Sequence, residues 1–237
     1  MIDSLLCCES FHSIQGEGPS VGKPSVFLRL SGCNLTCSGF GYGCDTRKIL
    51  QSSKKKMTFE EILDDWERVD WISKLSRGDH LVITGGEPSI QKDSLVKFLD
   101  FLVEFIPNLY VEIETNATIF LEELSWRVNQ INASPKLSCN GDPREKRYRP
   151  EVLRELQKTK KAFWKFVVTK VEDLEEIEND FLKPLRISPN FVWLMPEGGT
   201  RDALQAKREW VIELCKEKGM NYSGRLHIET WGERTGV

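Results

Sequence analysis

From about residue 24 to its end, this chain of 237 residues alternates short apolar runs with longer amphipathic segments. Such alternation is typical of a parallel sheet whose strands are joined by crossover helices. The pattern predicts strands at 25–30, 80–84, 109–114, 130–133, 163–168, 191–195 and 226–229. It predicts helices at 58–75, 90–105, 119–129, 149–159, 171–181 and 200–218.

Two helix boundaries have local signals. Thr58 followed by Glu61 has the spacing of a capping box, and Gly219 is placed to end the last helix. About six strand–helix units are too few for a closed eight-stranded barrel, so the sequence predicts an α/β fold, either an open partial barrel or a doubly wound sheet. No segment reads as a linker, and we expect one domain. The basic run Lys54–Lys56 is interpreted as a solvated loop.

Polar and glycine-rich segments follow the predicted strands. Gly32–Thr46 follows the first strand, Gly85–Pro88 the second, Thr115 and Asn116 the third, and Ser134–Lys136 the fourth. Because parallel strands end at one edge of a sheet, the active site is expected there.

Composition narrows the class of protein. Hydrophobic residues make up 40% of the chain and charged residues 29%, as in ordinary globular proteins. Neither a signal-peptide pattern nor an apolar run of about eighteen residues is present, so we expect a cytoplasmic protein without a membrane partner. The net charge of -3 argues against direct nucleic-acid binding, which depends on clustered Lys and Arg.

The seven cysteines include three that crowd into SGCNLTCSGFGYGCDT, at Cys33, Cys37 and Cys44. Thiolates this close favour a metal centre, either an iron–sulfur cluster or structural zinc. Zinc usually takes four protein ligands, whereas three cysteines leave one position open on a [4Fe–4S] cluster. The number of cysteines therefore favours an iron–sulfur cluster, and a non-catalytic zinc-binding module remains the alternative. The other cysteines are interpreted as small buried side chains: Cys7, Cys8, Cys139 and Cys215.

The three cysteines, followed by TGGEP at Thr84–Pro88, resemble the radical S-adenosylmethionine (SAM) superfamily. The usual spacing there has two residues between the second and third cysteines, and this chain has six. Within that superfamily, the chain is similar to the 7-carboxy-7-deazaguanine synthase family in eight segments: SIQGEG (13–18), FLRLSGCNLTC (27–37), CDT (44–46), TGGEP (84–88), ETN (114–116), SPK (134–136), LMPEG (194–198) and LHIETWGERTGV (226–237).

This resemblance implies an open partial (β/α)6 barrel of the radical SAM type, formed by residues 1–237 as a single domain. An N-terminal segment would bind substrate and a C-terminal tail would close the site. The implied enzyme is a carbon–nitrogen lyase that contracts 6-carboxy-5,6,7,8-tetrahydropterin to 7-carboxy-7-deazaguanine with loss of ammonia, as in queuosine-type biosynthesis. Its cofactors would be a [4Fe–4S] cluster, SAM and Mg²⁺. A flavodoxin or ferredoxin would donate electrons, and the enzyme would be a homodimer.

The resemblance also assigns roles to residues, with no catalytic side chain beyond the cofactors. It gives the cluster to Cys33, Cys37 and Cys44, and Mg²⁺ to Thr46, a hard oxygen ligand of the kind that this ion takes. SAM would contact Gly43, Asp45, Gly85, Gly86, Glu87, Ser134, Pro135, Lys136, Leu194, Met195, Pro196 and Glu197. Substrate would contact Ile14, Gln15, Gly16, Glu17, Arg29, Thr84, Glu114, Asn116, His227 and Val237.

Two expectations follow for these residues. Gln15 offers a donor and an acceptor to the amino-pyrimidinone edge of the pterin, and Arg29 offers a cation to its carboxylate. Side chains alternate faces along a strand, so an inward Arg29 requires a partner, because a buried unpaired charge is costly. A second enzyme alternative keeps the cluster and SAM but makes the protein an activase that places a glycyl radical on a partner protein.

Overall fold

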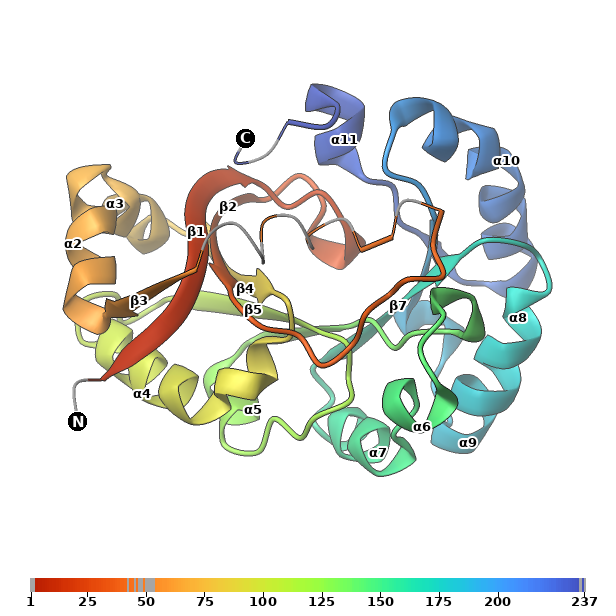
Figure 1. Ribbon diagram of the computed structural model, residues 1–237, viewed down its shortest axis with the longest axis horizontal. Helices are drawn as coiled ribbons and strands as arrows, with labels where there is room; N and C mark the ends of the chain where they lie inside the picture. The colour runs from red at the N-terminus through yellow and green to blue at the C-terminus, as the bar shows by residue number, and fades with distance from the viewer. Residues whose placement is uncertain are drawn as a thin grey trace.

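The computed structural model describes residues 3–41, 43–44, 46, 49, 54–234 and 236. Within these residues one sheet of nine strands has the order β3-β1-β2-β4-β5-β6-β7-β8-β9 (Figure 1). The strands are β1 (Ser4–Ile14), β2 (Pro24–Leu30), β3 (Lys55–Thr58), β4 (His80–Gly85), β5 (Tyr110–Thr115), β6 (Gln130–Ala133), β7 (Ala162–Val168), β8 (Val192–Pro196) and β9 (Asn221–Tyr222).

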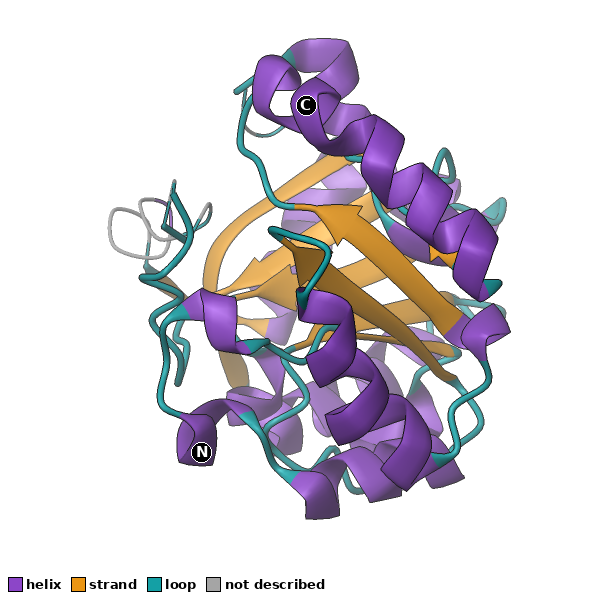
Figure 2. Ribbon diagram, turned by 90° about the vertical axis from the view of Figure 1, so that its right-hand side faces the viewer, coloured by secondary structure: helices purple, strands orange, loops and turns teal. Residues whose placement is uncertain are grey.

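Strands β2 to β9 run parallel, and β1 pairs antiparallel with both β2 and β3. The sheet is open, which confirms the predicted α/β fold with an incomplete barrel. Figure 1 shows the helices from α2 to α10 ranged around its outer side. Figure 2 shows mainly loops, in teal, on the left-hand side of the sheet in that view.

The α-helices are α2 (Phe59–Arg68), α3 (Trp71–Ser76), α4 (Lys92–Val103), α5 (Leu124–Arg127), α6 (Arg144–Arg147), α7 (Pro150–Lys158), α8 (Asp173–Glu176), α9 (Lys183–Leu185), α10 (Arg201–Lys218) and α11 (Leu226–Trp231). Short 3₁₀ turns form η1 (Gly18–Ser20), η2 (Pro88–Gln91), η3 (Ser138–Asn140) and η5 (Pro189–Phe191), and η4 (Ile177–Leu182) is π-helical. In the described part of the chain, none of the helices is long and apolar enough to cross a bilayer.

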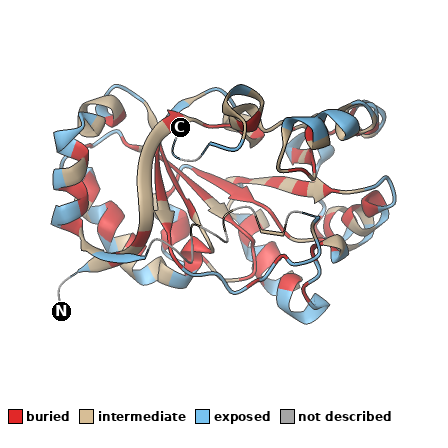
Figure 3. Ribbon diagram, turned by 45° about the horizontal axis from the view of Figure 1, so that its top comes forward, coloured by how far each residue is buried: buried red, intermediate tan, exposed pale blue. Residues whose placement is uncertain are grey.

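The core lies between the sheet and the inner faces of these helices. Helix α2 buries Ile62 and Trp66, and α4 buries Phe98 and Leu102, each pair four residues apart on one helix face. Figure 3 shows buried residues concentrated along the strands and on the helix faces that meet them. The predicted capping box is confirmed, because Thr58 Oγ1 accepts from Glu61 N at 3.2 Å and Glu61 Oε2 accepts from Thr58 N at 2.8 Å.

Three of the described strands were not predicted: β1, β3 and the short β9. The long strand β1 precedes the alternating part of the sequence, and most of its residues are only half-buried, so its hydrophobic signal is weak. The prediction of a loop at Lys54–Lys56 is wrong, because Lys55–Thr58 forms the edge strand β3 on β1. Its lysines are nevertheless exposed, and lysine on an edge strand discourages pairing with other chains.

Several predicted elements have different bounds or types. The predicted strand 226–229 is wrong: this segment is helix α11, and β9 at Asn221–Tyr222 ends the sheet. The predicted helix 58–75 divides at Asp70, whose φ of 62° is left-handed. Only Leu124–Arg127 of the predicted helix 119–129 is α-helical. Short apolar runs do not distinguish strand from helix periodicity, so these segments depended on their tertiary contacts.

Candidate active site

A cavity of about 600 Å³ opens at the C-terminal ends of the parallel strands. It collects residues from the β1–β2 loop, the cysteine loop, the strand ends and the C-terminal segment. The predicted site residues that line it are Ile14, Gln15, Gly16, Glu17, Arg29, Cys33, Cys37, Gly43, Cys44, Thr46, Thr84, Gly85, Gly86, Glu114, Asn116, Ser134, Lys136, Met195, Pro196, Glu197 and His227. The tertiary structure thus brings most of the predicted site residues together around one cavity.

The three cysteines line this cavity together. Cys37 is buried and takes a left-handed φ of 48°, and its sulfur accepts a hydrogen bond from Asn140 Nδ2 at 3.3 Å. Burial raises the pKa of the Cys37 thiol, and the nearby Lys136 ammonium opposes that rise. Cys44 Sγ lies 3.3 Å from Thr46 Oγ1. Within the described residues, no three His, Cys, Asp or Glu side chains group as a site for one metal ion. The chemistry of the donor set, three thiols lining one cavity, is that of the cysteine ligands of an iron–sulfur cluster.

The TGGEP turn packs directly on the start of the cysteine loop. A Cβ on Gly85 would lie 2.1 Å from Leu30 O, and one on Gly86 would lie 1.9 Å from Gly32 O. Only glycine fits at either position, and Gly85 also has a positive φ of 133°. This approach leaves a strip of glycine backbone facing the cavity.

Glu87 is fully buried and does not line the cavity. Its carboxylate accepts from Ser89 Oγ at 2.6 Å, from Thr115 Oγ1 at 2.8 Å and from Asn116 N at 2.6 Å. Burial raises the pKa of Glu87, and these hydrogen bonds counter the rise. Glu87 therefore fastens the TGGEP turn to the end of β5.

The polar floor of the cavity is formed by Glu114 and its partners. Gln15 Nε2 donates to Glu114 Oε1 at 3.1 Å, and Thr84 Oγ1 donates to Glu114 Oε2 at 2.7 Å. Asn116 lies nearby but is engaged elsewhere, since its Nδ2 donates to Asn34 Oδ1 at 2.9 Å. Glu114 thus presents an acceptor whose orientation is set by two neighbouring segments.

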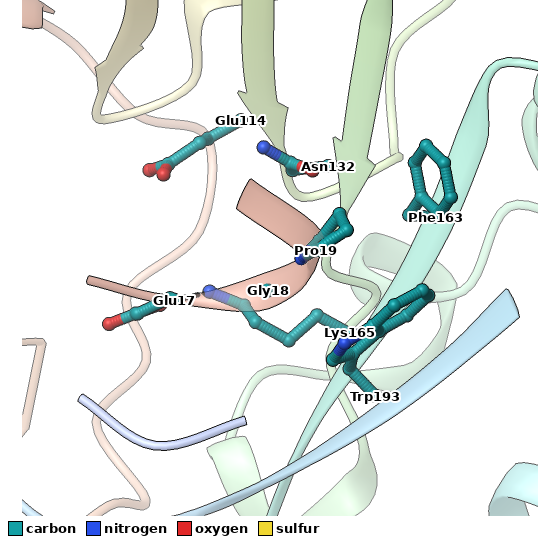
Figure 4. Close-up of a pocket in the computed structure, with 8 residues that line it drawn as sticks. All are labelled: Glu17, Gly18, Pro19, Glu114, Asn132, Phe163, Lys165 and Trp193. Atoms are coloured by element: carbon teal, nitrogen blue, oxygen red, sulfur yellow. Dashed lines mark hydrogen bonds and ion pairs between the residues drawn. The ribbon is translucent and has the colours of Figure 1, made fainter. Parts of the chain in front are cut away.

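Glu17 joins three parts of the chain through charge pairs. Arg225 Nε donates to Glu17 Oε1 at 2.8 Å, and Lys165 Nζ pairs with Glu17 Oε2. Burial alone would raise the pKa of Glu17, but Lys165, Arg225 and His227 together hold it well below its usual range. Figure 4 shows Lys165 reaching Glu17 beside a niche of about 10 Å³, close to the volume that one water needs.

Arg29 points inward and has the partner that its burial requires. Its Nε donates to Glu9 Oε1 at 2.8 Å, and its guanidinium lies 5.5 Å from the ring centroid of Phe11. Phe11 and Phe27 stack with centroids 4.9 Å apart. Phe11, Phe27 and Arg29 line the cavity together, so the two rings and the guanidinium form part of its surface.

His227 lies against the backbone of Gly16. A Cβ at Gly16 would be 2.0 Å from His227 Nδ1, and Leu226 N donates to Gly16 O at 2.9 Å. The first turn of α11 therefore docks on the QGE loop, which brings residues from both ends of the sequence to the cavity.

Some predicted residues lie elsewhere. Pro135 and Leu194 do not line the cavity, and Leu194 is fully buried in β8. Asp45 and Val237 lie outside the described residues. The sequence analysis missed Lys165, Arg225 and Asn132, all of which line the cavity. The signal for Lys165 was available: it is the one charged residue within the apolar run FWKFVV.

Comparison with known proteins adds to this geometry. Residues 14–154 match the family model described as "4Fe-4S single cluster domain". The 7-carboxy-7-deazaguanine synthase of Halobacterium salinarum is 32% identical over 95% of this chain and 90% of its own length. The 7-carboxy-7-deazaguanine synthase of Rhodopirellula baltica is 33% identical over 99% of this chain and 89% of its own length. The crystal structure of QueE from Escherichia coli covers 94% of this chain and 95% of its own, with a TM-score of 0.68 and 24% identity.

Proposed function

Because the chain belongs to the 7-carboxy-7-deazaguanine synthase family, we propose that it contracts 6-carboxy-5,6,7,8-tetrahydropterin to 7-carboxy-7-deazaguanine with loss of ammonia. One observation carries the proposal: three cysteines and the Gln15–Glu114–Thr84 hydrogen-bond set line the same cavity. Full-length relatives of this name favour the synthase over a glycyl-radical activase, and a match to a 4Fe-4S domain favours the cluster over zinc.

The cavity offers a surface for SAM beside the cysteines. The glycine strip at Gly85 and Gly86 leaves room for the methionine end of the molecule, and Ser134, Lys136 and Met195 line the neighbouring wall. Lys136 Nζ donates to Ser134 O at 2.9 Å, so its cation is held in place. When bound, the [4Fe–4S] cluster and SAM supply a 5′-deoxyadenosyl radical for hydrogen abstraction from the pterin.

The polar floor suits the amino-pyrimidinone edge of the pterin. Glu114 is pre-oriented by Gln15 and Thr84, so its remaining lone pairs can accept from the N–H groups of that edge without reorganisation. Arg29 stays fixed by Glu9 and can add a contact to the substrate carboxylate. His227, docked on Gly16, adds an imidazole to the cavity lining.

Further features of the proposal rest on the family. We assign Mg²⁺ to Thr46, whose hydroxyl lies at the cysteine loop. The electron donor is a flavodoxin or ferredoxin, and the enzyme is a cytoplasmic homodimer. The chain acts as a single domain, in which the N-terminal segment binds substrate and the C-terminal tail closes the site.

The test is an anaerobic assay of reconstituted protein with SAM, dithionite, Mg²⁺ and 6-carboxytetrahydropterin. Mass spectrometry should find 5′-deoxyadenosine and 7-carboxy-7-deazaguanine, and neither should form with Cys37→Ala. Omission of Mg²⁺ with added chelator should lower turnover. 5′-Deoxyadenosine without the deazaguanine would refute the substrate assignment and keep the cluster, whereas a zinc-loaded protein without either product would refute both.

A further inference from the structure

The segment that follows β6 and contains η3 packs against the cysteine loop. Asn140, at the end of η3, is completely buried, and its Nδ2 donates to Cys37 Sγ at 3.3 Å and to Asp142 Oδ2 at 2.9 Å. Its Oδ1 accepts from Asp142 N at 2.9 Å. Because a backbone N–H can only donate, the amide orientation is fixed and the donor side faces the sulfur.

Asp142 holds the backbone of the same cysteine. Its carboxylate accepts from Cys37 N at 2.8 Å and from Thr36 N at 3.0 Å. Cys37 has a left-handed φ of 48°, which a residue with a Cβ adopts only when its surroundings enforce it. Asp142 therefore enforces the backbone that aims the Cys37 sulfur at Asn140.

The fit between turn and loop excludes side chains at two glycines. Gly39 N donates to Asn140 O at 2.8 Å, and a Cβ on Gly39 would lie 2.5 Å from Cys139 O. A Cβ on Gly141 would lie 2.7 Å from Gly39 N. The two backbones are thus in direct contact, and the N–H···S hydrogen bond is built into that contact.

We propose that Asn140 is a positioning residue that tunes the reduction potential of the cluster bound by Cys37. A hydrogen bond to a ligand sulfur stabilises the more electron-rich reduced state of a cluster and raises its potential. The inference rests on the cluster part of the proposed function and is independent of the substrate. In the reduction that this potential describes, the cluster takes up one electron from the added reductant, and no bond is broken.

The test compares Asn140→Ala with Asn221→Ala, a matched loss of a part-buried amide on β9 whose Nδ2 donates to backbone carbonyls. Each protein is reconstituted anaerobically and titrated with dithionite, without SAM or substrate, while electron paramagnetic resonance follows the reduced cluster. At a given potential, the ratio of reduced to oxidised cluster should be roughly tenfold lower in Asn140→Ala than in the wild type. This corresponds to a midpoint potential about 59 mV more negative for a one-electron couple. Asn221→Ala should match the wild type.

Asp142→Asn supplies a readout that simple loosening of the loop would not give. It removes a negative charge beside the cluster and should move the midpoint to more positive potential, opposite to Asn140→Ala. A wild-type midpoint in Asn140→Ala with full iron content would overturn the proposal. Loss of the cluster from Asn140→Ala alone would also overturn it, assigning Asn140 to loop folding. A protein that keeps its cluster but makes no deazaguanine would refute only the synthase assignment.

Discussion

At the scale of single residues, the contact between Gly16 and His227 shows why a glycine is placed in the loop between β1 and β2. The imidazole occupies the position that a Cβ would take, with Nδ1 only 2.0 Å from it. No positive φ is involved at Gly16, so the requirement is for space and not for backbone freedom. A single methyl group there should displace the histidine from the cavity.

We predict that Gly16→Ala lowers kcat/KM for the pterin by on the order of 100-fold, because a shift of about 1 Å in a positioned group can have that effect. Steady-state kinetics with SAM and pterin would measure it, and thermal unfolding would check the fold. If the effect acts through His227, Gly16→Ala should add little in a His227→Ala background. Additive losses would contradict this explanation.

The sequence analysis selected Arg29 as a site residue but did not identify the carboxylate that pairs with its charge. Strand alternation required a partner for an inward Arg29, and nothing in the spacing identified Glu9 on the neighbouring antiparallel strand. Similarly, Glu87 lay in a recognisable motif, yet its burial beneath Ser89, Thr115 and Asn116 depends on how β4 and β5 end side by side.

At the scale of elements, α11 illustrates the limits of periodicity. The six residues Leu226–Trp231 are too few to form a stable helix alone. They are held by α10, where Arg201 Nη2 donates to Thr230 O at 2.8 Å and Arg201 Nε to Ile228 O at 3.2 Å. Ile228 O also accepts from Gly232 N at 2.8 Å, whereas Thr230 O is a C-terminal carbonyl that receives its donor from the Arg201 cation. Helix type here follows from packing.

We predict that Arg201→Ala raises KM for the pterin roughly fivefold, the equivalent of about 1 kcal/mol, because α11 positions His227 less firmly. Its kcat should change less than its KM. The matched control is Arg127→Ala on α5, which removes an exposed ion pair with Asp100 on α4 and should leave both constants unchanged. Equal KM values in wild type and Arg201→Ala would contradict the assignment.

At the scale of the whole molecule, the Glu17 network connects the two ends of the chain to the sheet. Glu17 follows β1, Lys165 lies in β7, and Arg225 precedes α11. Glu17 carries one negative charge against these two cations, and Lys165 also lies near the Glu114 carboxylate. Removal of Glu17 takes away the anion that Lys165 and Arg225 share, whereas removal of Lys165 leaves the Glu17–Arg225 ion pair in place.

We predict that Glu17→Gln lowers the free energy of unfolding by about 3–5 kcal/mol, the range for breaking a buried pair. Lys165→Met should cost clearly less, because Glu17 keeps Arg225. Urea unfolding at neutral pH would compare them. A larger loss in Lys165→Met than in Glu17→Gln would show that the anion is not the centre of the network.

The same network predicts an acid dependence. The pKa of Glu17 is lowered in the folded protein from its ordinary 4.5, so the folded state binds fewer protons than the unfolded state in acid. The stabilisation by Glu17 is present above about pH 4.5 and is lost as the pH falls through the folded pKa. Urea midpoints should therefore fall less between about pH 5 and pH 3 in Glu17→Gln than in wild type. Parallel curves would exclude this contribution.

Most of the cavity-lining residues were expected from the resemblance to a known family. The sequence by itself determined the longer parallel strands, the capped helix α2 and the place of the cysteine loop after a strand. These depend on local chemistry, such as strand ends, caps and motif spacing, which neighbouring residues specify. The tertiary structure alone decided strand β1, the edge strands β3 and β9, the helical state of α11, and the partners Glu9, Asn140, Asp142, Lys165 and Arg225. Charge balance and hydrogen-bond pairing join residues that are distant in sequence, and no local pattern records which will meet.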